Sequence, residues 1–211
     1  MENEQKLARF LDERFYVAPD FSSATRIVDL AEQMKGKDII VSSEKYGLTN
    51  AIIDEKCTAH YVNKDIPTFA FELSFLLPNW QEVEGWLTDP EKETEYYLLL
   101  YPFATLASSP SKVPVYDKIT KVRYILVRRS DVQRLLLEKG FNRTALLNKA
   151  QEMRRSVRCK EDNERIKAID RASYGFWFFY TFWLSEKPVN VVIPRGQLEA
   201  IAITTGFCAA D

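Results

Sequence analysis

The stretch Asp38-Ile-Ile-Val41, followed after a polar turn by Ala51-Ile-Ile-Asp54-Glu-Lys56, decides the fold of this chain. Both apolar runs are short and β-branched, and the turn between them contains Gly47, which predicts a β-hairpin. Because side chains alternate across a strand, Asp54 and Lys56 share a face and Glu55 points away. A hairpin centred on Gly47 puts Asp38 opposite Lys56, so that Asp38, Asp54 and Lys56 converge on one cleft. A register slip of one residue would turn Asp38 to the wrong face.

Two acids and a lysine on neighbouring strands are residues that suit a divalent cation. Mg²⁺ prefers carboxylate oxygens and water, and usually takes only one or two carboxylates from the protein. Such a cation lowers the pKa of its bound water and stabilises charge on a phosphoryl oxygen. A lysine beside it can orient the attacking water or neutralise the phosphate. Asp38, Asp54 and Lys56 therefore predict phosphodiester hydrolysis with Mg²⁺ or Mn²⁺, although a solvated hairpin with surface ion pairs would carry the same residues.

The next segment alternates cleanly between apolar and polar residues. From Pro67 to Phe75, four large apolar side chains take one face, and Glu72 lies among small residues on the other. This pattern predicts a third strand that lines the cleft and adds Glu72 to the catalytic residues. The alternative is a half-exposed strand with an ordinary surface glutamate.

The order of these motifs resembles the PD-(D/E)XK, or restriction-endonuclease-like, nuclease superfamily, and in particular its small bacterial and phage-type members. The resemblance covers roughly residues 5–105. It is carried by these segments, in this order: Arg26-x-x-Asp29-x-x-x-Gln33-x-x-Gly36-x-Asp38, Ile53-Asp54-Glu55-Lys56, Phe71-Glu72, Gly85-Trp86 and Thr94-Glu95-Tyr96-Tyr97. The resemblance implies an α/β restriction-endonuclease-like core with a mixed central β-sheet flanked by helices, dependence on a divalent metal, and cleavage of nucleic acid, most naturally DNA.

Carried over by position, the resemblance assigns roles to four residues. It makes Asp38 and Asp54 the metal ligands and Lys56 the catalytic lysine, while Glu72 binds metal or orients water. Gln33 and Asp29 would lie near the site.

Two residues depart from the family pattern. Lys37 stands where the family name has proline, and Glu95 stands where relatives tend to carry aspartate. The first position is loose in the family, and no role is assigned to the second.

The rest of the chain predicts further elements around this core. We expect residues 1–105 to form the nuclease-like core and residues 106–211 to form a C-terminal extension of strands and helices packed on the same domain. The expected elements are a helix at 3–16, a loop at 22–25, a helix at 27–34, strands to 75, a loop-rich segment at 77–93, strands at 95–102 and 121–128 flanking a loop at 103–118, helices at 130–139 and 142–155, a last strand at 189–193 and a terminal helix from 194.

Composition limits the possible partners and compartments. The net charge of −1 means that nucleic acid can be attracted only by local patches. In the basic stretch 149–171, five acids interrupt eight Lys and Arg residues, which favours a solvated face over a phosphate track. Three scattered cysteines and a polar start without an apolar core predict a cytoplasmic protein without a disulfide framework. The single histidine, His60, excludes a multi-histidine metal site.

The aromatic segment 174–184 is the most apolar run, yet its eleven residues are too few to span a bilayer. It predicts either a strand buried on both faces or a subunit contact, and hence a homo-oligomer. Two alternatives to the nuclease follow from these patterns. One is a non-catalytic nucleic-acid-binding relative with the same fold, and the other is a structural or partner-binding α+β protein that uses segment 174–184 as its interface.

Overall fold

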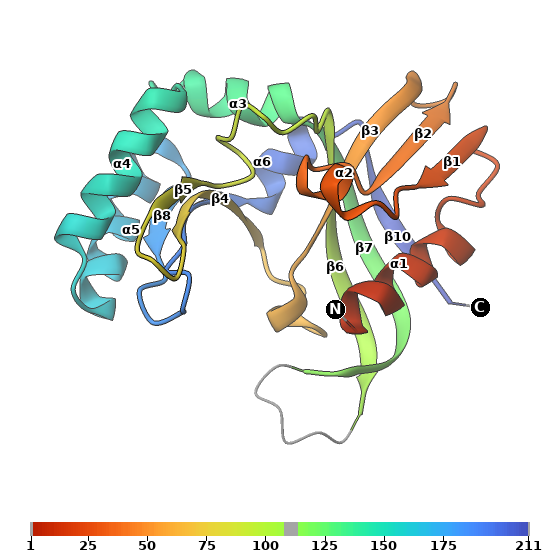
Figure 1. Ribbon diagram of the computed structural model, residues 1–211, viewed down its shortest axis with the longest axis horizontal. Helices are drawn as coiled ribbons and strands as arrows, with labels where there is room; N and C mark the ends of the chain where they lie inside the picture. Colours follow the sequence, from red (N-terminus) through yellow and green to blue (C-terminus); the bar gives the residue numbers. More distant parts are fainter. Residues whose placement is uncertain (1, 108–113, 211) are drawn as a thin grey trace. The chain divides into compact units, whose positions relative to one another are not determined.

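The computed structural model describes residues 2–107 and 114–210, and it is an α/β protein with a mixed central sheet flanked by helices (Figure 1). The chain divides into two compact units. Unit 1 comprises residues 1–66, 93–128 and 201–211, and unit 2 comprises residues 67–92 and 129–200. The units therefore do not follow the expected division at residue 105, because the strand β6 (Tyr96–Leu106) crosses that point and pairs along its whole length with the next strand of the chain.

Unit 1 is built on a six-stranded sheet with the order β1-β2-β3-β6-β7-β10. Besides β6, its strands are β1 (Ser23–Arg26), β2 (Ile39–Ser43), β3 (Leu48–Cys57), β7 (Tyr116–Arg128) and β10 (Thr204–Ala209). Among the described strands of this sheet, β3 and β6 alone pair in parallel, so the sheet is mixed. The parallel pair is possible because the whole of the unit 2 segment 67–92 lies between these two strands in the sequence.

One face of this sheet packs against the amphipathic helix α1 (Glu2–Arg14). Leu7, Phe10 and Leu11 of α1 are buried in a core that also contains Ile53 of β3 and Leu98 of β6. Each such side chain stabilises the fold by about 1.5–3 kcal/mol. The helix expected at residues 3–16 is confirmed. Two short helices, α2 (Leu30–Met34) and the 3-10 helix η1 (Ala59–Tyr61), complete unit 1.

Unit 2 has its own antiparallel sheet with the order β5-β4-β9-β8. Its strands are β4 (Thr68–Leu76), β5 (Glu82–Glu84), β8 (Trp177–Tyr180) and β9 (Val189–Pro194), and its helices are α3 (Arg129–Leu137), α4 (Arg143–Ser156), α5 (Lys160–Tyr174) and α6 (Arg195–Ala200). Helices α4 and α5 pack on this sheet, mainly on β8 (Figure 1). The expected cap is confirmed, since the Asn142 side chain accepts a hydrogen bond from the N–H of Ala145 at the start of α4.

Three of the expected loops and ends are wrong. Residues 23–26 form the edge strand β1, because pairing with β2 outweighs the loop preference of its serines and threonine. The loop expected at 103–118 is occupied by strand at both ends, up to Leu106 and from Tyr116, and its middle, 108–113, lies outside the described residues. The strand β9 is not the last one, since β10 follows α6 and pairs with β7.

The aromatic segment 174–184 lies mostly in the interior of unit 2. Phe176 and Phe178 are fully buried, which confirms a buried strand there, whereas Trp183 and Leu184 beyond the strand are exposed. Strand β8 is the edge of its sheet, and two side chains of α5 bind its outer edge: Asn163 both donates to the carbonyl of Tyr180 and accepts from its N–H, and Asp170 accepts from the N–H of Phe178. The subunit contact stays a prediction. Among the helices described, none has the length and apolar character needed to cross a membrane.

Candidate functional site

The hairpin brings Asp38 and Asp54 together in a register that differs from the expected one. Ile39 pairs with Ile53 and Ile40 with Ile52, so one further step puts Asp38 opposite Asp54 and not opposite Lys56. Two features set this register: the turn occupies residues 44–47 and so is centred before Gly47, and a β-bulge between Val41 and Ser43 shifts the pairing by one residue. The shift amounts to two residues, and a shift by an even number keeps each side chain on its face.

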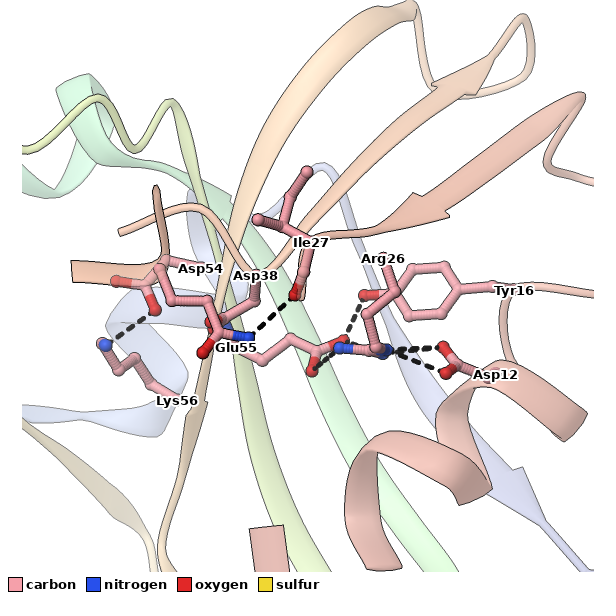
Figure 2. A network of polar contacts seen from close by, with 9 residues as sticks. Asp12, Tyr16, Arg26, Ile27, Asp38, Asp54, Glu55 and Lys56 are labelled. Atoms are coloured by element: carbon pink, nitrogen blue, oxygen red, sulfur yellow. Dashed lines mark hydrogen bonds and ion pairs between the residues drawn. The ribbon is translucent and has the colours of Figure 1, made fainter. Parts of the chain in front are cut away.

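Asp54 is buried, with 1% of its surface exposed. Its Oδ1 atom lies 2.6 Å from the ammonium Nζ of Lys56, which confirms that these two side chains share a face (Figure 2). Its Oδ2 atom is buried and receives no hydrogen bond from any of the described residues. Buried carboxylate oxygens ordinarily have a partner, so this oxygen is an exception that requires an explanation.

Asp38 completes the acid pair from the end of the neighbouring strand. Its Oδ2 atom accepts a hydrogen bond from the N–H of Glu55 at 2.7 Å. The pKa of Asp38 is raised to about 7, because burial disfavours its charged form and because the carboxylate of Asp54 is near. At neutral pH Asp38 therefore holds a proton far more readily than a free aspartate does.

Gly36 and Thr94 shape the space beside Asp54. Gly36 has φ +78°, and a β-carbon at this position would lie 2.1 Å from Oγ1 of Thr94 and 3.4 Å from Oδ2 of Asp54. Thr94 donates through Oγ1 to the carbonyl of Gly36 at 2.9 Å. Any other residue at position 36 would collide with Thr94, so the glycine permits the close approach of the chain to Asp54.

Glu55 faces away from the acid pair, as the strand alternation predicts, and its carboxylate binds side chains on the opposite face of β3. The guanidinium of Arg26 donates to both oxygens of Glu55 and to both oxygens of Asp12, over distances of 2.7–3.0 Å (Figure 2). The hydroxyl of Tyr16 donates to Glu55 at 2.8 Å, and burial together with Glu55 raises the pKa of Tyr16. This network fixes the backbone N–H that binds Asp38.

Glu72 lies on β4, in the sheet of unit 2, so β4 is not the third strand next to the hairpin. That place belongs to β6, which pairs in parallel with β3. The backbone of Glu72 packs directly on Gly85, where a β-carbon would come within 2.5 Å of the Glu72 carbonyl, and the ring of Trp86 lies 5.1 Å from that of Phe71. The third and fourth motifs of the resemblance, Phe71-Glu72 and Gly85-Trp86, thus contact each other. A role for Glu72 beside Asp54 stays a prediction.

Other residues of the resemblance have structural partners. Asp29 caps α2 by accepting from the N–H groups of Ala31 and Glu32. Gln33 donates through Nε2 to the carbonyl of Ile27 at 2.8 Å, next to the Arg26 network.

Lys37, Glu95 and His60 also stay outside the acid pair. Lys37 forms ion pairs with Glu32 and Glu93. The carboxylate of Glu95 accepts from the N–H of Ile52, which aligns the start of β6 with β3. His60 is exposed on η1.

The residues present fit a hard divalent cation held by two carboxylates. Among the described residues no group of three or more His, Cys, Asp and Glu side chains could hold a metal. A magnesium site does not need such a group, because Mg²⁺ usually keeps several waters and binds one or two carboxylates. A cation bound there would give the Oδ2 of Asp54 a partner and would favour the charged form of Asp38.

Sequence reasoning missed Gly36, Thr94, Arg26 and Tyr16 as residues that build the site. Gly36, Arg26 and Thr94 were part of the resemblance but carried no role, and the only available signal was their fixed order before Asp38 and β6. A comparison of the chain with protein-family models, curated proteins and solved structures found no match.

Proposed function

We propose that this protein is a metal-dependent nuclease with a restriction-endonuclease-like core that hydrolyses phosphodiester bonds of nucleic acid, with DNA as its substrate. The observation that carries the proposal is the buried Oδ2 of Asp54, which receives no hydrogen bond from the described residues and lies beside a second acid and a lysine. An unpartnered buried carboxylate oxygen costs about 1–3 kcal/mol or more, and a bound cation would remove that penalty.

Each residue of the pair has a role in this proposal. Asp38 and Asp54 would hold Mg²⁺ or Mn²⁺. The cation, when bound, lowers the pKa of a water and neutralises charge on the phosphoryl oxygens. Lys56, whose ammonium is partly exposed and bound to Asp54, would place its positive charge beside the phosphate or orient the attacking water. Arg26 and Glu55 would act on the opposite face of β3 by keeping the N–H of Glu55 directed at Asp38.

The test is cleavage of single-stranded and double-stranded DNA and RNA in the presence of Mg²⁺ or Mn²⁺. We expect Lys56→Ala to lose on the order of 10²–10³ in rate, as is typical when one preorganised electrostatic group is removed. Lys45→Ala is the matched control, because Lys45 lies in the same hairpin and also pairs with an aspartate, Asp20, at 2.6 Å. A wild type that cleaves none of these substrates, or a Lys56→Ala variant as active as Lys45→Ala, would overturn the proposal.

A further inference from the structure

Two tryptophans of unit 2 are exposed to solvent. Trp80 has 68% of its surface exposed and Trp183 has 49%, and the neighbouring Leu184 has 45%. The other two tryptophans of the chain are covered, since Trp177 is buried and Trp86 is half-buried. Large aromatic side chains are usually covered in a folded protein, and exposed apolar patches often mark interaction sites. The two exposed rings of unit 2 are therefore candidates for a binding surface.

The backbone around Trp80 is held in an unfavourable conformation. Trp80 has φ +66° and Lys187 has φ +42°, while the two other non-glycine residues with positive φ are asparagines, which tolerate it. The two residues contact each other, with the ammonium of Lys187 3.9 Å from the centroid of the Trp80 ring. Strain of this kind, of order 1–3 kcal/mol for each residue, persists mainly at binding and catalytic sites.

Three segments of unit 2 meet at this pair. Leu76, which ends β4 directly before the turn 77–81, donates its N–H to the carbonyl of Glu186 in the loop 181–188, at 2.7 Å. The segment 154–160, from the last turn of α4 to the first residue of α5, contacts the same loop twice. Arg154 donates to the carbonyl of Lys187 at 2.6 Å, and the ammonium of Lys160 lies 5.5 Å from the ring of Trp183.

These three segments are rich in positive charge on a chain whose net charge is −1. They contain Arg154, Arg155, Arg158, Lys160 and Lys187, and Glu186 is their single acid. Arg154 is neutralised by Glu82, but the other four cations form no ion pair within the described residues. The acids that follow in α5 are partly engaged, since Asp162 binds Arg165 and the N–H of Arg158. Arg158, Lys160 and Lys187 thus form no ion pair with the described residues, although Glu161 lies beside Lys160 and Glu186 beside Lys187, and an anionic ligand would meet three cations and two acids here.

The edge of β8 is not available to a strand of another chain, because Asn163 and Asp170 already bind its outer N–H and carbonyl groups. What remains accessible are the side chains of the tryptophan surface, which we define as Trp80, Trp183, Leu184, Arg158, Lys160 and Lys187. We propose that this surface binds single-stranded nucleic acid, with unpaired bases stacked on the two indole rings and phosphates at the lysines and arginine. Bases within a duplex are stacked on each other, so only a single strand can offer their faces to tryptophan.

The binding surface is proposed independently of the nuclease activity; only the idea that the bound strand is also the substrate rests on the proposed function. Binding itself is measured without catalysis, by fluorescence anisotropy of a labelled oligothymidylate in EDTA. We expect Trp183→Ala to raise Kd by roughly 5- to 100-fold, the range for loss of one stacked base, and Trp183→Phe to restore most of the affinity. Quenching of tryptophan emission by the strand should decrease in the same variants.

The salt dependence of Kd tests the phosphate contacts separately. The double variant Lys160→Gln/Lys187→Gln should lower the slope of log K against log salt by about 1.4, because each contact with a single strand contributes about 0.7. The matched controls are Leu137→Ala and Lys139→Gln, two exposed positions of unit 2 outside this surface, and both should bind like the wild type.

Several outcomes would overturn the inference. They are a wild type that binds no oligonucleotide, equal affinity for the single strand and its duplex, Trp183→Ala binding like Leu137→Ala, or binding of anionic phospholipid vesicles in place of the strand. Binding in EDTA without cleavage in Mg²⁺ would support the surface and contradict the nuclease. Cleavage without the tryptophan effect would contradict the surface and leave the nuclease standing.

Discussion

Two aspartates, one in each unit, are buried to nearly the same extent but in very different surroundings. Asp54 of unit 1 is 1% exposed and Asp170 of unit 2 is 4% exposed. Asp170 accepts a hydrogen bond from the N–H of Phe178, and neither of its oxygens is both buried and without a donor among the described residues. Asp54 shares one oxygen with Lys56, has an unpartnered second oxygen, and lies beside another acid.

The comparison shows that burial of an acid does not by itself indicate a functional site. Burial raises the pKa of Asp170, yet its carboxylate has an evident structural task, which is to satisfy the edge of β8. Asp54, in contrast, has one oxygen, Oδ2, that forms no hydrogen bond with the described residues. A buried oxygen without a donor is therefore the better indicator of a functional site, because burying it destabilises the fold and no structural contact compensates for that.

The largest expected difference between the two aspartates is in activity. Asp54→Asn should lower the cleavage rate by at least 10²-fold, because a neutral amide is a poor ligand for a hard cation and no longer balances Lys56. Asp170→Asn should leave the rate within about twofold, since the amide oxygen can still accept from Phe178 and the site lies in the other unit. Both variants are assayed with the same substrate at saturating Mg²⁺. Similar losses in the two variants would mean that Asp54 acts only through stability.

The second difference concerns metal binding, measured as a change in melting temperature. Millimolar Mg²⁺ or Mn²⁺ should stabilise the wild type, and a cation present at 100 times its Kd adds about 2.7 kcal/mol. Asp170→Asn should keep this response, whereas Asp54→Asn and Asp38→Asn should lose most of it. Lys56→Ala should keep or strengthen it, because a competing positive charge is removed from Asp54. An unchanged melting temperature of the wild type would contradict the assignment of both ligands.

The third difference is in folding stability, and here Asp170 should matter more. Asp170→Ala leaves the buried N–H of Phe178 without its acceptor, which should lower the free energy of unfolding by about 1–3 kcal/mol. Asp170→Asn should restore most of that loss. Urea unfolding in EDTA measures both. If alanine and asparagine behave alike, the hydrogen bond to the edge of β8 contributes little, and the contrast with Asp54 loses its physical basis.

Local patterns predicted much of the fold and most of the acid pair. The β-branched runs around Gly47 gave the hairpin, and strand alternation gave the shared face of Asp54 and Lys56 and the opposite direction of Glu55. The register was two residues off, because the turn begins at Glu44 and a β-bulge lies between Val41 and Ser43, and no local signal fixes either. An even shift left the convergence of Asp38 and Asp54 intact.

What the sequence could not predict were contacts between segments far apart in the chain. Alternation in residues 67–75 correctly predicted β4, but nothing in the pattern says which sheet a strand joins, and β4 pairs with β9 about 120 residues later. The edge strands β1 and β10 are short and rich in serine, threonine or glycine, so their pairing with β2 and β7 decides their conformation. The contact between Trp80 and Lys187 likewise joins residues that only the fold brings near each other.

The last expected difference is in how stability depends on pH. In the unfolded chain the pKa of an aspartate is about 3.9, and folding raises the pKa of Asp38 to about 7, through burial and the nearby charge of Asp54. The folded state therefore holds this proton more tightly. The resulting stability is fully present below about pH 4 and is lost as the pH rises through 7. In EDTA the free energy of unfolding should fall between pH 5 and 7, by at most about 1.4 kcal/mol per pH unit for one proton.

Variants of Asp38 and Asp170 separate the contributions of these two residues to the pH dependence of stability. Asp38→Asn should flatten the slope, because the amide has no proton to lose and its oxygen can still accept from the N–H of Glu55. Burial also raises the pKa of Asp170, so Asp170→Asn should remove a contribution of the same sign while leaving that of Asp38. The slope is measured by urea unfolding at several pH values. A wild-type slope retained in Asp38→Asn would mean that the two acids of the hairpin do not repel each other, and the reason for expecting a cation between them would then be gone.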